Sequence, residues 1–140
     1  MPQVRRRSDS TRMVRKVLLT AIVAASLAAC RPSEPLNVTT IQTGKSLNSD
    51  NSVATHTTRF TPKDAMYVAA LTSGRGSGII EARWSVGGRV IHEAKKDVSY
   101  IEPAATAFRF EAADGFRVGN YVVEVFVDGT SVGTRNLKVE

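Results

Sequence analysis

The residue best suited to covalent chemistry is Cys30, the only cysteine in this chain of 140 residues. Its sulfur is a nucleophile that can carry an added group. The small residues Ala28 and Ala29 precede it, and they suit a peptidase that must grip extended backbone. Upstream, an apolar run of about eleven residues, Val17 to Leu27, follows two basic residues. A bilayer-spanning helix needs about 20 residues, so this run has the length of a secretory h-region instead.

The tetrapeptide Leu27, Ala28, Ala29 and Cys30 resembles the lipobox of bacterial lipoproteins. The resemblance implies a diacylglyceryl cysteine, cleavage before Cys30, and a further fatty acid such as palmitate on the new amino terminus. Residues 1–29 are then a lipoprotein signal peptide, with Met13 as an alternative start. A plain signal peptide, or a buried helix that ends in a stray cysteine, is the other interpretation.

The lipobox also implies a location. Three acyl chains hold a protein at a membrane almost permanently. In enterobacterial lipoproteins an aspartate after the cysteine resembles an inner-membrane retention signal, and this chain has Arg31 there. The expected location is therefore the cell envelope, at the periplasmic face of the outer membrane, with the inner membrane as the alternative.

Loss of the signal peptide changes the net charge of the protein. The precursor has a formal net charge of +6, but six of its 19 Lys and Arg residues and one of its 13 acidic residues lie before Cys30. The mature chain is therefore 13 minus 12, or +1. This near-neutral charge argues against nucleic acid as a partner. A single cysteine also excludes an internal disulfide, so the core alone must hold the fold.

The composition divides the mature chain into two parts. Residues 30–55 hold the cysteine and a stretch rich in Ser, Thr, Asn and Pro without sustained periodicity, which is typical of a flexible linker. Residues 56–140 show short alternating apolar segments, which predict an all-β domain. We expect eight strands, over 57–60, 66–72, 79–86, 89–95, 97–101, 106–112, 120–128 and 131–139.

Turn signals and alternation give this domain its expected core. Gly87–Gly88 and Asp128–Gly129 are typical of two-residue hairpin turns. Alternate residues of a strand share a face, so each long strand should bury one set of side chains, with Trp84 as the largest. These sets comprise Ile80, Ala82, Trp84 and Val86; Phe108 and Phe110; and Tyr121, Val123, Val125 and Val127.

The segments around Trp84 and Tyr121 are similar to immunoglobulin-like β-sandwich modules of bacterial envelope lipoproteins. The features are a central-strand tryptophan, a glycine turn after it, and Gly119, Asn120 and Tyr121 leading into a valine-rich strand. The resemblance implies an immunoglobulin-like antiparallel sandwich of about seven or eight strands, here without sheet-bridging cysteines. It also implies a tyrosine corner at Tyr121, whose hydroxyl would bond backbone; ligand stacking is the alternative.

The residues that catalysis or metal binding needs are scarce. His56 and His92 are the only histidines, and without further cysteines they leave too few ligands for a zinc site. His92 and Glu93 are adjacent on a strand and therefore point to opposite faces. We predict no catalytic residue, no metal site and no cofactor.

Two loops offer candidate partner surfaces. One is the glycine-rich Ser73–Gly78, expected to be mobile, which carries Arg75. The other is the segment 113–119, where Phe116 and Arg117 are of types enriched at interfaces; alternatively, Phe116 caps the end of the sandwich.

The sequence predicts a non-catalytic module that binds an envelope protein, as an accessory subunit of an assembly or as a peptidase inhibitor. The alternative is a module that binds a small ligand or a glycan. Such a module needs exposed aromatic side chains, and most of the few aromatics here are assigned to the core. An enzyme is the third interpretation, because the residues it needs are missing.

Overall fold

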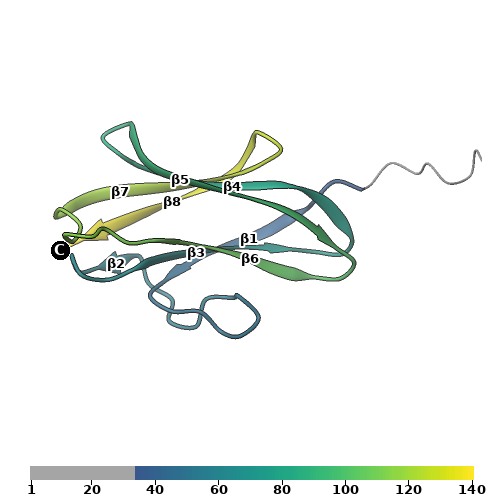
Figure 1. The fold of residues 1–140 in the computed structure, drawn as a ribbon, viewed down its shortest axis with the longest axis horizontal. Coiled ribbons are helices and arrows are strands. Elements are labelled where there is room, and N and C mark those ends of the chain that lie inside the picture. Colours follow the sequence, from purple (N-terminus) through teal and green to yellow (C-terminus); the bar gives the residue numbers. More distant parts are fainter. Residues whose placement is uncertain (1–33) are drawn as a thin grey trace, which may run out of the picture. The chain divides into compact units, whose positions relative to one another are not determined.

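Two facing β-sheets make up the computed structural model, which describes residues 34–140 (Figure 1). The smaller sheet has the strand order β1-β3-β6, and the larger one the order β2-β8-β7-β4-β5. The strands are β1 (Val38–Gly44), β2 (Arg59–Phe60), β3 (Met66–Thr72), β4 (Gly76–Val86), β5 (Arg89–Tyr100), β6 (Ala104–Phe110), β7 (Gly119–Val127) and β8 (Thr130–Val139). Their pairs are antiparallel except for the short β2, which runs parallel to β8.

The predicted all-β sandwich is confirmed, and the core lies between the sheets. Trp84 is fully buried, as are Val123 and Val125 on the neighbouring β7. Val86 was expected to be buried with Trp84, but 38% of it is exposed because β4 ends there, beyond the edge of the core. No helix in the described part of the chain is long and apolar enough to cross a bilayer. The predicted signal peptide and Cys30 lie outside the described residues.

The prediction of a flexible linker over residues 30–55 is wrong for the part that the structure describes. Residues 38–44 form β1, which pairs with β3 along its whole length. Ile41 faces the core and is 7% exposed, while Thr40 faces outward. The threonines that suggested a linker are β-branched residues that suit a half-exposed edge strand.

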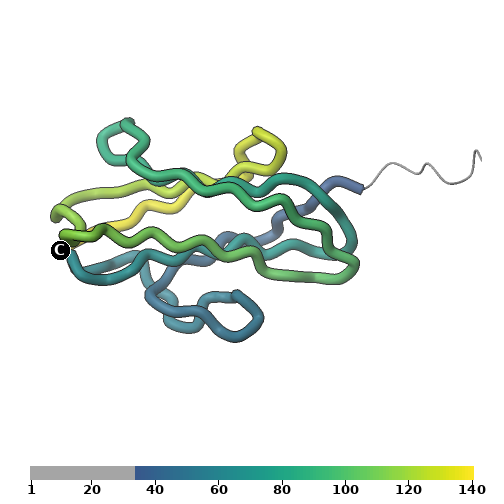
Figure 2. Tube along the Cα trace, in the orientation of Figure 1, coloured from purple at the N-terminus to yellow at the C-terminus, as the bar shows by residue number. Residues whose placement is uncertain are grey.

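Residues 45–57 form an excursion that lies against the outer face of the smaller sheet (Figure 2). Val53 is 3% exposed, and its N–H donates to the Gln42 side chain over 2.9 Å. Gly44 permits this close approach, because a Cβ there would lie 2.0 Å from the Thr55 carbonyl oxygen. This segment is therefore part of the domain.

The larger sheet also differs from the expectation at its edge. The two strands predicted over 89–95 and 97–101 are one continuous strand, β5, which pairs with the whole of β4. Lys96 of β5 donates to the Ala107 carbonyl of β6 over 2.5 Å and so bridges the two sheets. The total of eight strands is as predicted, but β1 replaces the strand lost by this merger.

Both predicted hairpin turns are confirmed. Gly87, Gly88, Asp128 and Gly129 all have positive φ, which two-residue turns between right-twisted strands require. The loop predicted over Ser73–Gly78 is shorter than expected, because β4 begins at Gly76.

The burial of Trp84 leads to a stability prediction. Trp84→Ala should lower the free energy of unfolding by about 3 to 5 kcal/mol, because it removes the largest buried side chain. Urea denaturation measures this loss. Trp84→Phe should cost less, since it keeps most of the volume and removes the indole N–H, the one buried side-chain polar atom in the described residues without a partner. A loss below about 1 kcal/mol for the alanine variant would contradict the core assignment.

The outer face of the larger sheet carries an ion-pair network around Glu81. The Arg83 Nε donates to Glu81 over 3.0 Å, and the Arg83 guanidinium lies 4.2 Å from the centre of the Phe126 ring. The hydrogen bond from Arg83 lowers the pKa of Glu81 below its ordinary 4.5, against the opposing effect of burial. The stabilisation by Glu81 is thus present above pH 4.5 and is lost as the pH falls through the lowered pKa.

The lowered pKa of Glu81 leads to a prediction about how stability depends on pH. Glu81→Gln should lower the free energy of unfolding at pH 7, and its difference from wild type should shrink as the pH falls below 4.5. Arg83→Gln should remove the same part of the pH dependence, since Arg83 is the main cause of the shift. Denaturation curves over this pH range test both variants. A difference from wild type that does not change with pH would contradict this assignment.

Candidate binding site at one end of the sandwich

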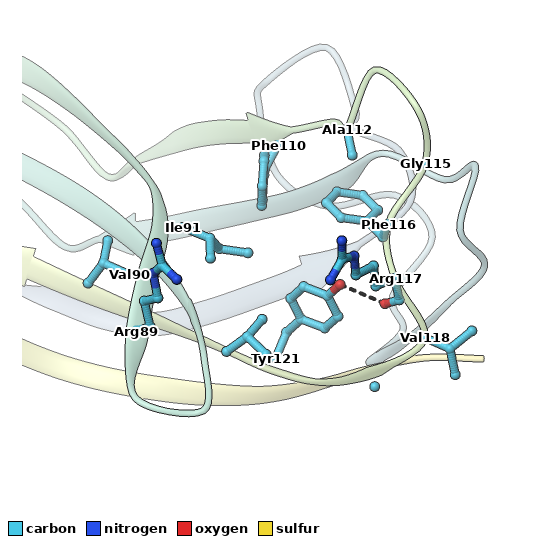
Figure 3. A pocket seen from close by; sticks show the side chains of 12 residues that line it. Arg89, Val90, Ile91, Phe110, Ala112, Gly115, Phe116, Arg117, Val118 and Tyr121 are labelled. Carbon is cyan, nitrogen blue, oxygen red and sulfur yellow. Dashed lines mark hydrogen bonds between the residues drawn. The ribbon is translucent and has the colours of Figure 1, made fainter.

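A pocket of about 700 Å³ opens at the end of the sandwich where the β4–β5 hairpin and the β6–β7 loop meet (Figure 3). One wall is the hairpin, with Arg89, and the opposite wall is the loop, with Arg117. The lining residues are Val86, Arg89, Val90, Ile91, Phe110, Ala112, Gly115, Phe116, Arg117, Val118, Gly119 and Tyr121. The lining is therefore mostly apolar, with two cations.

An aromatic cluster connects this pocket to the core. The ring of Phe110 stacks on His92 with a centroid distance of 4.3 Å, and Trp84 packs against both. Phe116 meets Phe110 and Tyr121 edge to face, at 4.9 and 5.8 Å. Such edge-to-face contacts fix ring orientation, so the aromatic side of the pocket has a defined shape.

The predicted tyrosine corner is present. The Tyr121 hydroxyl donates to the Arg117 carbonyl over 2.6 Å, and the ring is 5% exposed. This bond fixes the loop just before β7 at Arg117, whose side chain lies over the pocket (Figure 3). The Phe116 N–H donates to the Pro62 carbonyl over 2.7 Å and fixes the other side of the loop.

A β-bulge shapes the hairpin wall. Trp84 pairs with His92 and Ser85 with Val90, so Ile91 is the extra residue on β5. Bulges change the direction in which side chains point. Here Ile91 points toward the pocket together with Arg89 (Figure 3). Val90 and Ile91 remain 48% and 43% exposed at the rim.

Within residues 34–140, the two arginines of the pocket have no carboxylate partner. The ion pairs of the described residues include neither Arg89 nor Arg117, whereas Arg83 and Arg109 each pair with a glutamate. The lining itself contains no acidic residue. Two positive charges therefore stand beside an apolar surface, where a ligand carboxylate would meet no competitor within the lining.

Two of the three residues predicted as a partner surface come together. Arg117 and Phe116 both line the pocket, and Phe116, at 6% exposure, also caps the end of the sandwich. Arg75 is exposed at the opposite end, next to the start of β4. Arg89 and Ile91 could not be predicted as pocket residues, because the β-bulge next to the hairpin turn leaves no periodic pattern in the sequence.

Both histidines make contacts within the sandwich. His92 stacks on Phe110, and His56 forms an isolated bridge with Gly44. Residues 34–140 contain no group of three or more His, Cys, Asp or Glu side chains placed to hold a metal ion.

A second hollow, of about 580 Å³, lies between the excursion and the ends of β1, β3 and β6. Its lining includes Thr, Ser, Asp, Asn and Tyr side chains, most of which bond other groups of the protein. Asp50 accepts from the N–H and hydroxyl of Ser52, which lowers the pKa of Asp50. The hydroxyls of Tyr100 and Thr106 lie 2.7 Å apart in a hydrogen bond. This hollow thus offers few free hydrogen-bonding groups to a ligand.

The tyrosine corner leads to a testable expectation. Tyr121→Phe should lower the free energy of unfolding by about 1 kcal/mol, because a half-buried hydrogen bond is lost while the ring remains. Amide hydrogen exchange should accelerate at residues 115–119 and stay unchanged in β4. Equal exchange in both proteins would mean that the hydroxyl does not hold the loop.

Comparisons with known proteins identify the fold. No protein-family model matches the chain, and no curated protein matches it significantly. An immunoglobulin-like protein from Pseudomonas aeruginosa superposes with a TM-score of 0.53 at 11% identity, over 79% of this chain and 100% of that one. A cycloisomaltooligosaccharide glucanotransferase from Paenibacillus sp., solved in complex with cycloisomaltoheptaose, gives a TM-score of 0.55 at 16% identity. That match covers 77% of this chain but only 14% of the glucanotransferase. At these identities the likeness shows the fold alone, and residues 34–140 are an immunoglobulin-like β-sandwich.

Proposed function

We propose that this chain is a lipid-anchored, non-catalytic binding module of the cell envelope, which presents its end pocket to a protein partner. The observation that carries the proposal is an exposed apolar pocket with two unpaired arginines, at the end of the sandwich far from the point where the chain enters it. The anchor is the acylated Cys30, and the surface is the periplasmic face of the outer membrane.

The distance between the two ends supports this arrangement. The N-terminal segment joins the domain at the start of β4, where Ser77 donates to the Glu34 carbonyl over 2.9 Å. The pocket lies at the other end of β4, beside Val86. The ten residue steps from Gly76 to Val86 span about 33 Å of extended strand. The β4–β5 hairpin and the β6–β7 loop, which form the pocket, therefore lie at the opposite end of the sandwich from the entry point of the chain (Figure 1).

The short stretch of chain between Cys30 and the first described residue also supports the proposed arrangement. Cys30 is four residues before Glu34, the first residue of the described part. Four steps reach at most about 14 Å. An anchor at Cys30 would thus hold the entry end of the sandwich close to the bilayer, instead of on the slack linker expected from composition, and the pocket would remain accessible.

The exposed apolar side chains favour a protein partner. Seven large apolar side chains are exposed in the described residues, and four of them line the pocket: Val86, Val90, Ile91 and Val118. Val118 alone is 70% exposed. Apolar patches with a polar or charged rim mark interaction sites, and arginine is enriched at protein interfaces. In the second hollow, most of the polar side chains that a glycan would need already bond other groups of the protein.

The experiment tests anchor and pocket together in native cells. A photo-crosslinking residue at Val118 should join the full chain to one defined envelope protein, while the same residue at Ile101 should not. Ile101 is 79% exposed, but it follows the end of β5 far from the pocket, so it is the matched control.

The same cells test the lipid anchor, through fatty-acid labelling and membrane association. Cys30→Ser should abolish labelling by a palmitate analogue and release the chain from the membrane, whereas Ser33→Ala should change neither. Continued labelling of the serine variant would rule out the anchor. Equal cross-linking from Val118 and Ile101 would rule out the pocket as the binding surface.

A further inference from the structure

We propose that the end pocket binds a segment of the partner polypeptide in which an apolar side chain lies next to a carboxylate. The inference rests on the proposed function and specifies the chemistry of the partner at the same site. It follows from one juxtaposition: Arg89 and Arg117 lie on opposite walls of an apolar pocket that contains no acid of its own.

The apolar part of the pocket suits a side chain with adjacent backbone. Its volume of about 700 Å³ is within the range of ligand sites. Ile91 of the hairpin and Val118 of the loop line the pocket together with the rings of Phe110 and Tyr121. An aliphatic or aromatic side chain that enters this space buries its own apolar surface. It also covers exposed apolar surface at the rim of the pocket, and both effects favour binding.

The charge in the pocket suits a carboxylate. A guanidinium can donate two parallel hydrogen bonds to a carboxylate. Glu93 lies 3.6 Å from Arg83 and Glu111 pairs with Arg109. Asp114, three residues before Arg117, is outside the lining and forms no ion pair in the described residues. No internal ion pair therefore has to break when a ligand carboxylate binds Arg89 or Arg117.

The walls that carry the arginines are held before any ligand binds. Arg117 belongs to the loop fixed by the Tyr121 hydroxyl. Arg89 directly follows the two-glycine turn and pairs with Val86 in the β4–β5 ladder. Cations on rigid elements lose less conformational freedom when they bind a ligand. The same rigidity fixes the separation between the charged and the apolar contacts, which gives selectivity.

The test uses the full chain in detergent solution and three blocked peptides. The first is acetyl-Ser-Leu-Glu-Ser-amide, the second replaces its glutamate by glutamine, and the third replaces its leucine by serine. Calorimetric titration should show binding of the first peptide and at least about tenfold weaker binding of the other two, as expected when a charged hydrogen bond or a buried leucine is removed. Amide chemical-shift changes should be confined to residues 86–92 and 110–121.

Variants locate the charged contact. Arg89→Gln and Arg117→Gln should each weaken binding of the first peptide about tenfold, with unfolding free energies close to that of wild type. Arg75→Gln removes an exposed, unpaired arginine at the other end of the sandwich and should leave binding unchanged.

Three results would overturn the inference. They are equal binding of the glutamate and glutamine peptides, equal binding of the leucine and serine peptides, and an equal loss of binding in the Arg75 variant. None of them affects cross-linking from Val118, so a failure of this inference is distinguishable from a failure of the proposed function.

Discussion

The packing of aromatic rings at one end of the sandwich is the interaction on which the site depends. Trp84 fills the core, and Phe110 and His92 stack beside it. Phe116 and Tyr121 continue the cluster by edge-to-face contacts. In this way one cluster closes the end of the core and forms the inner side of the pocket. Stability and the shape of the binding surface therefore come from the same side chains, without a disulfide or a metal among the described residues.

The first strand determines how the module relates to its proposed anchor. The core needs β1, because Ile41 packs so closely on β8 that a Cβ on Gly133 would lie 2.8 Å from its Cδ1 atom. The ordered domain consequently includes residues that composition assigns to a linker. Only three residues, 31–33, separate Cys30 from the described part. An anchor at Cys30, as proposed, would keep the entry end of the domain within about 14 Å of the bilayer.

Much of the fold follows from the sequence, because long buried strands leave a clear alternation. The faces of β4 and β7, the glycine turns and the tyrosine corner at Tyr121 are all readable from it. Strand β1 is not, because an edge strand buries few side chains and Thr39 and Thr40 resemble linker residues. The site is only partly predictable for a similar reason. Arg117 lies in a recognisable loop, whereas Arg89 enters the pocket through a hairpin whose bulge has no sequence pattern.

The central claim is that these rings and the Arg117 loop form one fixed structure in solution. The most direct test is the measurement of nuclear Overhauser effects between aromatic side chains in the full chain. We expect contacts from Phe110 to His92, from Phe116 to Phe110 and from Tyr121 to Phe116. Absence of these contacts in a chain that still shows β-sheet circular dichroism would contradict a fixed cluster.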